Sequence, residues 1–211
     1  MSTHAESLPK GLVAGVLILT LVVLALGGAV VAIRLRPEPL PENAVDRTVV
    51  QWQQTVDDNP KDSRAYTGLG LALLDADRDA EAQDAFRRAI ALDDTAWLAQ
   101  FQMGLLLEDT DPARALELIA SAAKLAPDQE AVAPLIASGD LLLEIGEPAE
   151  ARDAYARSLV VNPFLIDGHY GLGAAYEALG REKAALREYR EAGRFDPNNE
   201  AVAEAIERLG G

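Results

Sequence analysis

The feature that most constrains this 211-residue sequence is a pattern that recurs four times, at spacings of 34, 35 and 34 residues. The copies align on one glycine each, and a bulky residue follows every glycine at a matching distance. The glycines are Gly70, Gly104, Gly139 and Gly173, and the bulky residues are Phe86, Ile119, Tyr155 and Tyr189. A period of this length predicts a stacked repeat array, in which each unit buries its apolar face against its neighbours.

Each copy is predicted to form two amphipathic helices around a short turn. In the last copy, apolar residues recur at helical spacing on both sides of Gly180, which is placed to end the first helix. The small residues Gly173 and Ala185 would let the two helix backbones approach closely. The helices are expected at 63–76, 79–92, 95–108, 112–125, 130–145, 148–161, 165–179 and 182–194.

The copies resemble the tetratricopeptide repeat. The order of aromatic, Leu-Gly, Tyr, Gly, Ala, aromatic, Ala and Pro positions is clearest from His169 to Pro197, and the four copies fill residues 61–198. The resemblance implies an all-α fold, a right-handed α-solenoid of helical hairpins, and binding of protein partners. It does not identify the partner, because one fold serves many functions. The second copy departs from the pattern, since its turn before Pro112 is one residue short and lacks glycine.

The segment from Leu12 to Ile33 contains 22 residues without a charge. At about 1.5 Å per residue it reaches roughly 33 Å, which matches a hydrocarbon core of about 30 Å. We therefore expect a transmembrane helix. A cleaved signal peptide is the alternative, but its apolar core is shorter and needs a cleavage site of small residues, for which the sequence offers no convincing match.

The orientation of this helix is less determined by the sequence. Lys10 lies on one side, and Arg34 and Arg36 lie on the other. Counting these charges slightly favours a cytoplasmic repeat domain. A single N-terminal anchor ahead of a soluble domain favours export, and we expect an extracytoplasmic domain, with the cytoplasmic orientation left open.

The remaining segments connect the anchor to the repeats and close the array. The segment 44–60 resembles the second half of a repeat whose first half is missing, and its Trp52 is expected to be a core residue rather than a binding residue. The predicted order is a tail at 1–11, a transmembrane helix at 12–33, a proline-rich linker at 34–43, the half-repeat helix at 44–60, four repeats at 61–198 and a capping helix at 199–211.

The formal net charge of −15 lies entirely outside the first 44 residues, which carry three basic and three acidic side chains. A strongly acidic repeat region repels nucleic acid and attracts basic partners. The alternative is that acidic side chains simply solvate the helix faces.

The sequence shows no pattern of residues suited to catalysis. It has no cysteine, which excludes disulfides, thiolate metal sites and thiol catalysis. Its histidines are His4 in the tail and His169, which is expected to be a packing residue in the fourth copy and has no partner histidine at metal-ligand spacing. We expect no enzyme activity, no metal and no cofactor.

A partner is instead expected on the first helices of the repeats, which line the concave face of such arrays. The positions that do not face the paired helix are mixed apolar and acidic. The predicted partner-binding residues are Leu71, Phe101, Leu105, Glu108, Ile136, Asp140, Tyr170 and Glu177, and Thr67, Leu74, Leu143 and Ala174 lie on the same faces. We expect a protein or peptide with apolar anchors and Lys or Arg flanks.

The layout of anchor, spacer and repeats resembles bacterial membrane-bound repeat proteins. The segment 49–73 is similar to those that present apocytochrome c during cytochrome c maturation and to those that assist outer-membrane or pilus assembly. The resemblance implies a non-catalytic scaffold or assembly factor for a membrane or exported complex. The alternatives are a cytoplasmic-facing adaptor for regulatory proteins and a structural subunit of a membrane complex.

Overall fold

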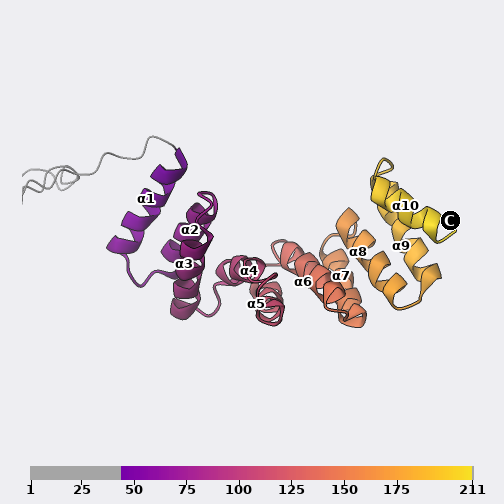
Figure 1. The fold of residues 1–211 in the computed structure, drawn as a ribbon, viewed down its shortest axis with the longest axis horizontal. Helices are drawn as coiled ribbons and strands as arrows, with labels where there is room; N and C mark the ends of the chain where they lie inside the picture. The colour runs from indigo at the N-terminus through magenta and orange to yellow at the C-terminus, as the bar shows by residue number, and fades with distance from the viewer. Residues whose placement is uncertain (1–43, 211) are drawn as a thin grey trace, which may run out of the picture. The chain divides into compact units, whose positions relative to one another are not determined.

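The computed structural model describes residues 44–210, and its regular structure there consists of ten α-helices with no strand (Figure 1). The helices are α1 (Ala44–Asp58), α2 (Ser63–Leu74), α3 (Asp79–Leu92), α4 (Trp97–Leu105), α5 (Pro112–Leu125), α6 (Val132–Glu144), α7 (Pro148–Val161), α8 (Ile166–Ala178), α9 (Glu182–Phe195) and α10 (Glu200–Arg208).

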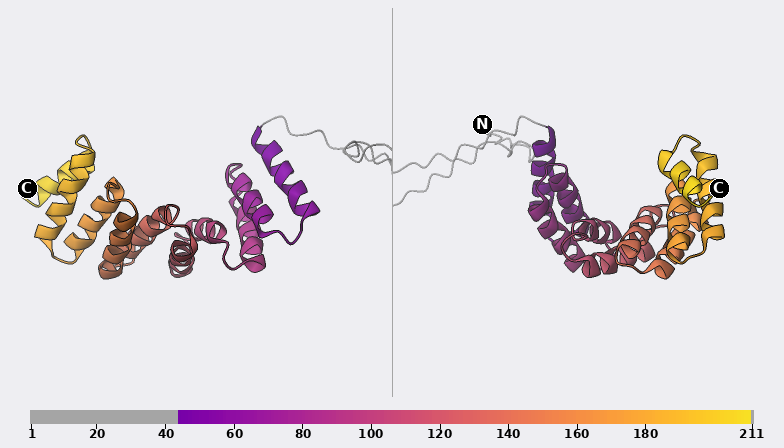
Figure 2. Two further views of the ribbon diagram at one scale, coloured as in Figure 1. Left: turned by 180° about the vertical axis from the view of Figure 1, so that it is seen from behind. Right: turned by 45° about the vertical axis from the view of Figure 1, so that its right-hand side comes forward.

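Helices that are adjacent in the chain pack as hairpins. The pairs α2–α3, α4–α5, α6–α7 and α8–α9 form repeats one to four, and each repeat also contacts the next (Figure 2). Helix α1 packs against α2, and α10 packs against α9. The predicted all-α array of helical hairpins is therefore confirmed.

Several predictions concern residues that lie outside the described part of the chain. They are the tail at 1–11, the transmembrane helix at 12–33 and the linker at 34–43. In the described range 44–210, no helix has both the length and the hydropathy needed to cross a membrane.

The recurring glycine of each repeat contacts the recurring bulky residue of the same repeat inside the hairpin. A Cβ atom added at Gly139 would lie 2.6 Å from the Tyr155 ring, and one at Gly173 would lie 2.6 Å from the Tyr189 ring. Both tyrosine side chains are almost completely buried. The first and second helices of a repeat can approach this closely because the glycine leaves room for the ring.

Two helix boundaries differ clearly from the predictions. Helix α4 was expected to reach Glu108 but ends at Leu105, because its short turn continues in i to i+3 hydrogen bonds rather than stopping at one left-handed residue. The turns of repeats three and four do stop in this way, at Gly146 (φ +84°) and Gly180 (φ +70°). Helix α6 was expected from residue 130 but begins at Val132, because residues 128–131 form a turn.

The α3, α5 and α7 helices have the predicted bounds, and α2, α8 and α9 lie within two residues of theirs. The segment predicted at 44–60 contains a helix that ends at Asp58, and the capping helix predicted at 199–211 spans Glu200–Arg208. The side chain of Asp62 accepts a hydrogen bond from the backbone N–H of Arg64 and so caps α2. Asn199 caps α10 in the same manner and is not its first residue.

Candidate functional site

A pocket of about 490 Å³ opens beside α2, between α1 and the start of α4. Its apolar walls include Trp52, Leu71 and Trp97, and Arg64 and Asp93 belong to its polar part. The full lining is Trp52, Ser63, Arg64, Thr67, Gly68, Leu71, Asp93, Thr95, Ala96, Trp97, Leu98 and Ala99. An apolar hollow with a few polar groups is the usual form of a site for a partner side chain.

Trp52 lines this pocket from α1, the first of the described helices. It lies six residues before the end of α1, as Tyr155 and Tyr189 lie six residues before the ends of α7 and α9. Its ring packs on Gly68 of the following repeat, where an added Cβ would lie 2.6 Å away. Trp52 is therefore a half-buried packing residue, as predicted, and it also lines the pocket.

The predicted apolar positions of the central repeats are half-buried. Phe101 and Leu105 of α4 pack on a cluster that contains Ile119, and Ile136 of α6 packs on the cluster around Tyr155. Each of these three side chains is partly exposed and partly packed against the core. Tyr170 of α8 is more exposed, at 36%, and its ring centroid lies 5.4 Å from that of Tyr189.

A group of four carboxylates surrounds the turn after α4 and the end of α6. Glu108, Asp109, Asp140 and Glu144 make no ion pair with any of residues 44–210. Partial burial raises the pKa of Glu108, and the negative charges of Glu144, Asp109 and Asp140 raise it further. We call these four residues the acidic cluster. It concentrates uncompensated negative charge on the predicted binding face.

Asp140 belongs both to this cluster and to the packing of repeat three. The buried hydroxyl of Tyr155 donates a hydrogen bond of 2.6 Å to the carboxylate of Asp140. Burial and this carboxylate together raise the pKa of the Tyr155 phenol. Asp140 itself remains exposed, so the tyrosine fixes its position while leaving it open to a partner.

Glu177, the last predicted binding residue, is already engaged by the C-terminal helix. Arg208 of α10 donates two hydrogen bonds to its carboxylate, at 3.1 and 2.8 Å, and Tyr189 donates a third at 2.9 Å. The hydrogen bonds from Arg208 are the main reason why the pKa of Glu177 lies below its usual value. A partner that used Glu177 would first have to displace Arg208.

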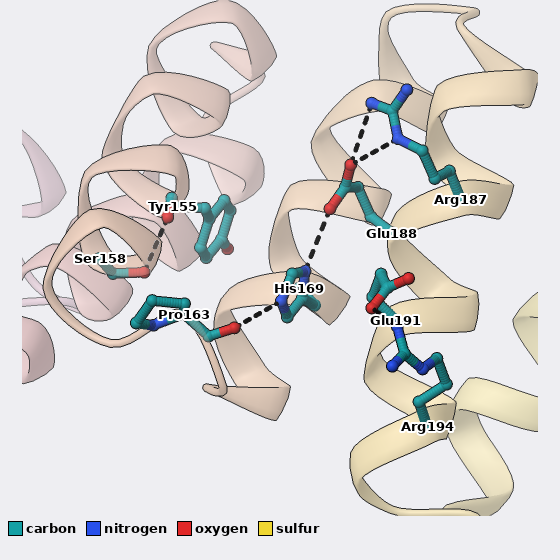
Figure 3. Close-up of polar contacts among 8 residues, drawn as sticks. All are labelled: Tyr155, Ser158, Pro163, His169, Arg187, Glu188, Glu191 and Arg194. Carbon is teal, nitrogen blue, oxygen red and sulfur yellow. Dashed lines mark hydrogen bonds and ion pairs between the residues drawn. The ribbon is translucent and has the colours of Figure 1, made fainter.

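His169 connects three segments of repeat four (Figure 3). Its Nδ1 atom lies 3.1 Å from a carboxylate oxygen of Glu188 on α9, and its Nε2 atom lies 3.1 Å from the carbonyl oxygen of Pro163. Arg187 contacts the other oxygen of Glu188. His169 has a structural role, because both ring nitrogens are engaged within the fold. Among the described residues, no group of His, Asp or Glu is arranged to hold a metal ion.

The sequence patterns did not identify the tryptophan-lined pocket. Trp97 is the first residue of α4, and nothing in the sequence around it indicates a binding site. Arg64 looks in the sequence like an ordinary exposed residue of α2. One available signal was that both tryptophans of the chain lie near the start of the array. The structure brings Trp52 and Trp97 to the same pocket with Leu71, the first residue of the predicted binding face.

Two curated relatives are transferases that are much longer than this chain. The protein O-mannosyl-transferase TMTC3 of Homo sapiens is 27% identical over 123 residues, which cover 57% of this chain and 13% of that protein. The UDP-N-acetylglucosamine–peptide N-acetylglucosaminyltransferase of Giardia intestinalis is 28% identical over 138 residues, which cover 64% of this chain and 9% of that protein. The matches span a small part of each relative.

Several solved structures share the fold. The MamA crystal structure superposes with a TM-score of 0.65 at 19% identity, covering 72% of this chain and 89% of that one. YrrB, described as a TPR protein with an unusual peptide-binding site, gives 0.68 at 16% identity, with coverages of 75% and 81%. PilF of Pseudomonas aeruginosa gives 0.68 at 18% identity, with coverages of 79% and 75%.

The repeat columns, the hairpin packing and these superpositions agree with a family model. The model of the tetratricopeptide repeat matches residues 51–96 and 136–200, which together are more than half of the chain. Proteins of this family mediate interactions with other proteins or with peptides. This chain belongs to the tetratricopeptide repeat family.

Proposed function

We propose that this protein is a membrane-tethered docking or assembly factor that binds a segment of another protein along the first helices of its repeats. The observation that carries the proposal is the placement of the tryptophan-lined pocket and the acidic cluster along these helices. A partner with an apolar anchor and nearby Lys or Arg residues matches both features. The apolar side chain of the partner would be buried in the pocket, and its cations would reduce the repulsion among the carboxylates of the acidic cluster.

The membrane tether rests on the sequence of residues 12–33. An extracytoplasmic repeat domain remains our preferred orientation, and a role in cytochrome c maturation or in outer-membrane or pilus assembly is the corresponding pathway. A reporter fused after Gly211 tests the orientation, because only an exported domain activates a periplasm-dependent reporter. A cytoplasmic result would favour the adaptor function instead.

A non-catalytic role fits the described residues. Both ring nitrogens of His169, the single described histidine, are engaged within the fold. In the pocket, the Thr95 hydroxyl donates a hydrogen bond to Asp93 within the turn before α4, which is a local turn contact. The transferase names of the two relatives do not extend to this chain, because it spans only 13% and 9% of their lengths.

Peptides of defined chemistry test the binding face directly. A fluorescent peptide with two tryptophan or leucine anchors and flanking lysines is compared with the same peptide carrying glutamates in place of the lysines. We expect the basic peptide to bind, more weakly at high salt, and the acidic peptide not to bind. Equal binding of both peptides would contradict the proposed charge preference.

A charge-reversal variant in the acidic cluster tests where on the domain the basic peptide binds. Glu108→Lys should weaken the basic peptide by about fivefold or more, which corresponds to ~1 kcal/mol. Glu150→Lys is the matched control, because Glu150 is exposed on α7, a second helix, and the change in net charge is the same. If both variants weaken binding equally, only the overall charge matters and the proposed site is wrong.

A photocrosslinking residue at Tyr170 or Phe101, used in intact membranes, would identify the natural partner. Tyr170 is the better position because it is the more exposed. The double variant Leu105→Glu and Ile136→Glu should abolish partner capture, but both side chains pack on buried clusters. Retained helicity must therefore be shown for that variant before a loss of capture is interpreted.

A further inference from the structure

Repeat three exposes large apolar side chains where the other repeats carry small or polar ones. Val160, one residue before the end of α7, is 83% exposed, and Phe164, in the following turn, is 70% exposed. The residues equivalent to Val160 are Ala91, Lys124 and Arg194, and those equivalent to Phe164 are Thr95, Asp128 and Asn198. The packing of a repeat therefore does not require an apolar residue at the position of Val160. The Phe164 ring is partly engaged, because it lies edge-on to the Phe195 ring with 5.6 Å between the ring centroids.

A pocket of about 380 Å³ lies next to Val160, between the end of α5, the start of α6 and the end of α7. Its apolar part includes Leu135 and Val161, and its charged residues are Lys124, Arg157 and Asp128. Neither Lys124 nor Arg157 forms an ion pair with another of residues 44–210, although this region is strongly acidic. The pocket thus combines apolar surface with two cations available to a partner.

The opposite end of the same repeat has the complementary chemistry. Ile145, in the turn between α6 and α7, is 42% exposed and stands between Glu144 and Glu147. Glu147 occupies the position that holds Arg78 before α3 and Arg181 before α9. The residues equivalent to Ile145 are Ala76, Thr110 and Leu179, and none of these three is a large exposed hydrophobic residue.

We propose that two copies of this chain associate through repeat three, with the α6–α7 turn of one copy docked on the α5–α7 pocket of the next. Ile145 would enter the apolar part of the pocket beside Val160. Glu144 and Glu147 would lie near Lys124 and Arg157, which fixes the orientation of the contact. Charge complementarity identifies a second copy as the occupant, because the chain itself supplies an apolar residue between two carboxylates.

This contact joins different surfaces of the two copies, so it is head-to-tail and leaves one of each surface free. Repetition of the contact gives rows or rings of copies rather than closed dimers. The two surfaces of one chain cannot meet each other, because the 14 residues of α7 separate them by about 20 Å. The contact goes beyond the proposed function and leaves the first-helix face open to a partner.

Crosslinking with introduced cysteines tests the contact in the full-length chain in mild detergent, since the natural sequence has no cysteine. Asp128→Cys marks the pocket and Ala149→Cys marks the turn, and both leave the proposed contact residues intact. A short bismaleimide should give a covalent dimer in a mixture of the two variants and little from either alone. The double variant should give a ladder of dimers, trimers and larger species.

A matched control measures random collisions within the micelle. Asn198→Cys is the repeat-four equivalent of Asp128→Cys and is also exposed. Its mixture with Ala149→Cys should give only background crosslinking. If the Asp128→Cys mixture gives no more product than this control, the proposal is overturned. Efficient crosslinking of Asp128→Cys chains to each other would also overturn it, since that product requires a symmetric contact.

Charge variants separate this interface from the peptide-binding face. Val160→Glu places a carboxylate where Glu144 and Glu147 of the docked copy would lie and should reduce crosslinking to background. Ala91→Glu makes the same change in charge at the equivalent exposed position of repeat one and should leave crosslinking unchanged. Binding of the basic peptide should be equal in both variants. Crosslinking that survives Val160→Glu would refute the contact even if peptide binding is confirmed.

Discussion

Replacing Gly139 by alanine tests whether the repeats depend on close helix approach. In an ordinary helix this change stabilises by about 1 kcal/mol, because alanine has the higher helix propensity. Here the new Cβ would lie 2.6 Å from the ring of Tyr155, which is 1% exposed. Gly171 of the next repeat approaches the same ring, and the Tyr155 hydroxyl is held by Asp140. The ring therefore has little freedom to move away.

The magnitude follows from two opposing effects. Overpacking a well-filled core costs about 1–3 kcal/mol, which exceeds the propensity gain of about 1 kcal/mol. We expect Gly139→Ala to destabilise by roughly 1 kcal/mol. Gly193 in α9 is the control, because its added Cβ would lie 3.4 Å from the side chain of Val202, an ordinary contact distance. Gly193→Ala should therefore stabilise by up to about 1 kcal/mol.

Urea denaturation followed by far-UV circular dichroism measures both variants. The Gly139→Ala midpoint should fall and the Gly193→Ala midpoint should rise, with unchanged slopes if unfolding stays cooperative. In a Tyr155→Leu background, Gly139→Ala should become neutral or stabilising, because the clash is with the ring. The reasoning is refuted if Gly139→Ala raises the midpoint of the natural sequence as much as Gly193→Ala does.

Three further predictions concern polar groups. Tyr155→Phe removes the hydrogen bond to Asp140 and should lower the unfolding free energy by about 1 kcal/mol, measured by the same denaturation. Because Glu177 has a lowered pKa in the fold, docking of α10 is stabilised above its usual pKa of about 4.3 and should weaken as pH falls below that value, seen as lower amide protection factors in α10. Arg208→Ala should remove most of this pH dependence, because Arg208 is the main cause of the lowered pKa and only the hydrogen bond from Tyr189 remains. Because the pKa of Glu108 is raised in the fold, its ionised form destabilises the fold, and Glu108→Gln should raise the urea midpoint at neutral pH. The difference in midpoint between this variant and the natural sequence should shrink as pH falls through that raised pKa.

The sequence predicted the hairpins well because the determinants are local and repeated. Each glycine faces the bulky residue of its own repeat, so the pair Gly173 and Tyr189 occurs at the same spacing as Gly139 and Tyr155. The segment 44–60 was recognised as the second half of a repeat, and α1 fills it as far as Asp58. Because the same pattern occurs four times, the helix positions can be inferred from all copies together even where one copy is irregular.

The site was less predictable because it depends on contacts between distant segments. Glu177 looked like an open groove residue, but Arg208 lies 31 positions later and reaches it only when α10 docks. The pocket beside Leu71 requires α1, α2 and α4 to come together around Trp52 and Trp97. Neither arrangement leaves a periodic signal, since each occurs at one end of the array.

The acidic cluster can be separated from charges that only keep the surface hydrated. Exposed carboxylates elsewhere form ion pairs with a nearby arginine. Glu117 pairs with Arg114 on the same helix, and Glu81 pairs with Arg78 just before α3. Glu108 is instead partly buried beside three like charges, which raises its pKa and makes its ionised form unfavourable in the free protein. Solvation does not require that arrangement. A bound cation would both attract these carboxylates and remove their mutual repulsion, so the same local geometry that weakens the free domain favours a basic partner.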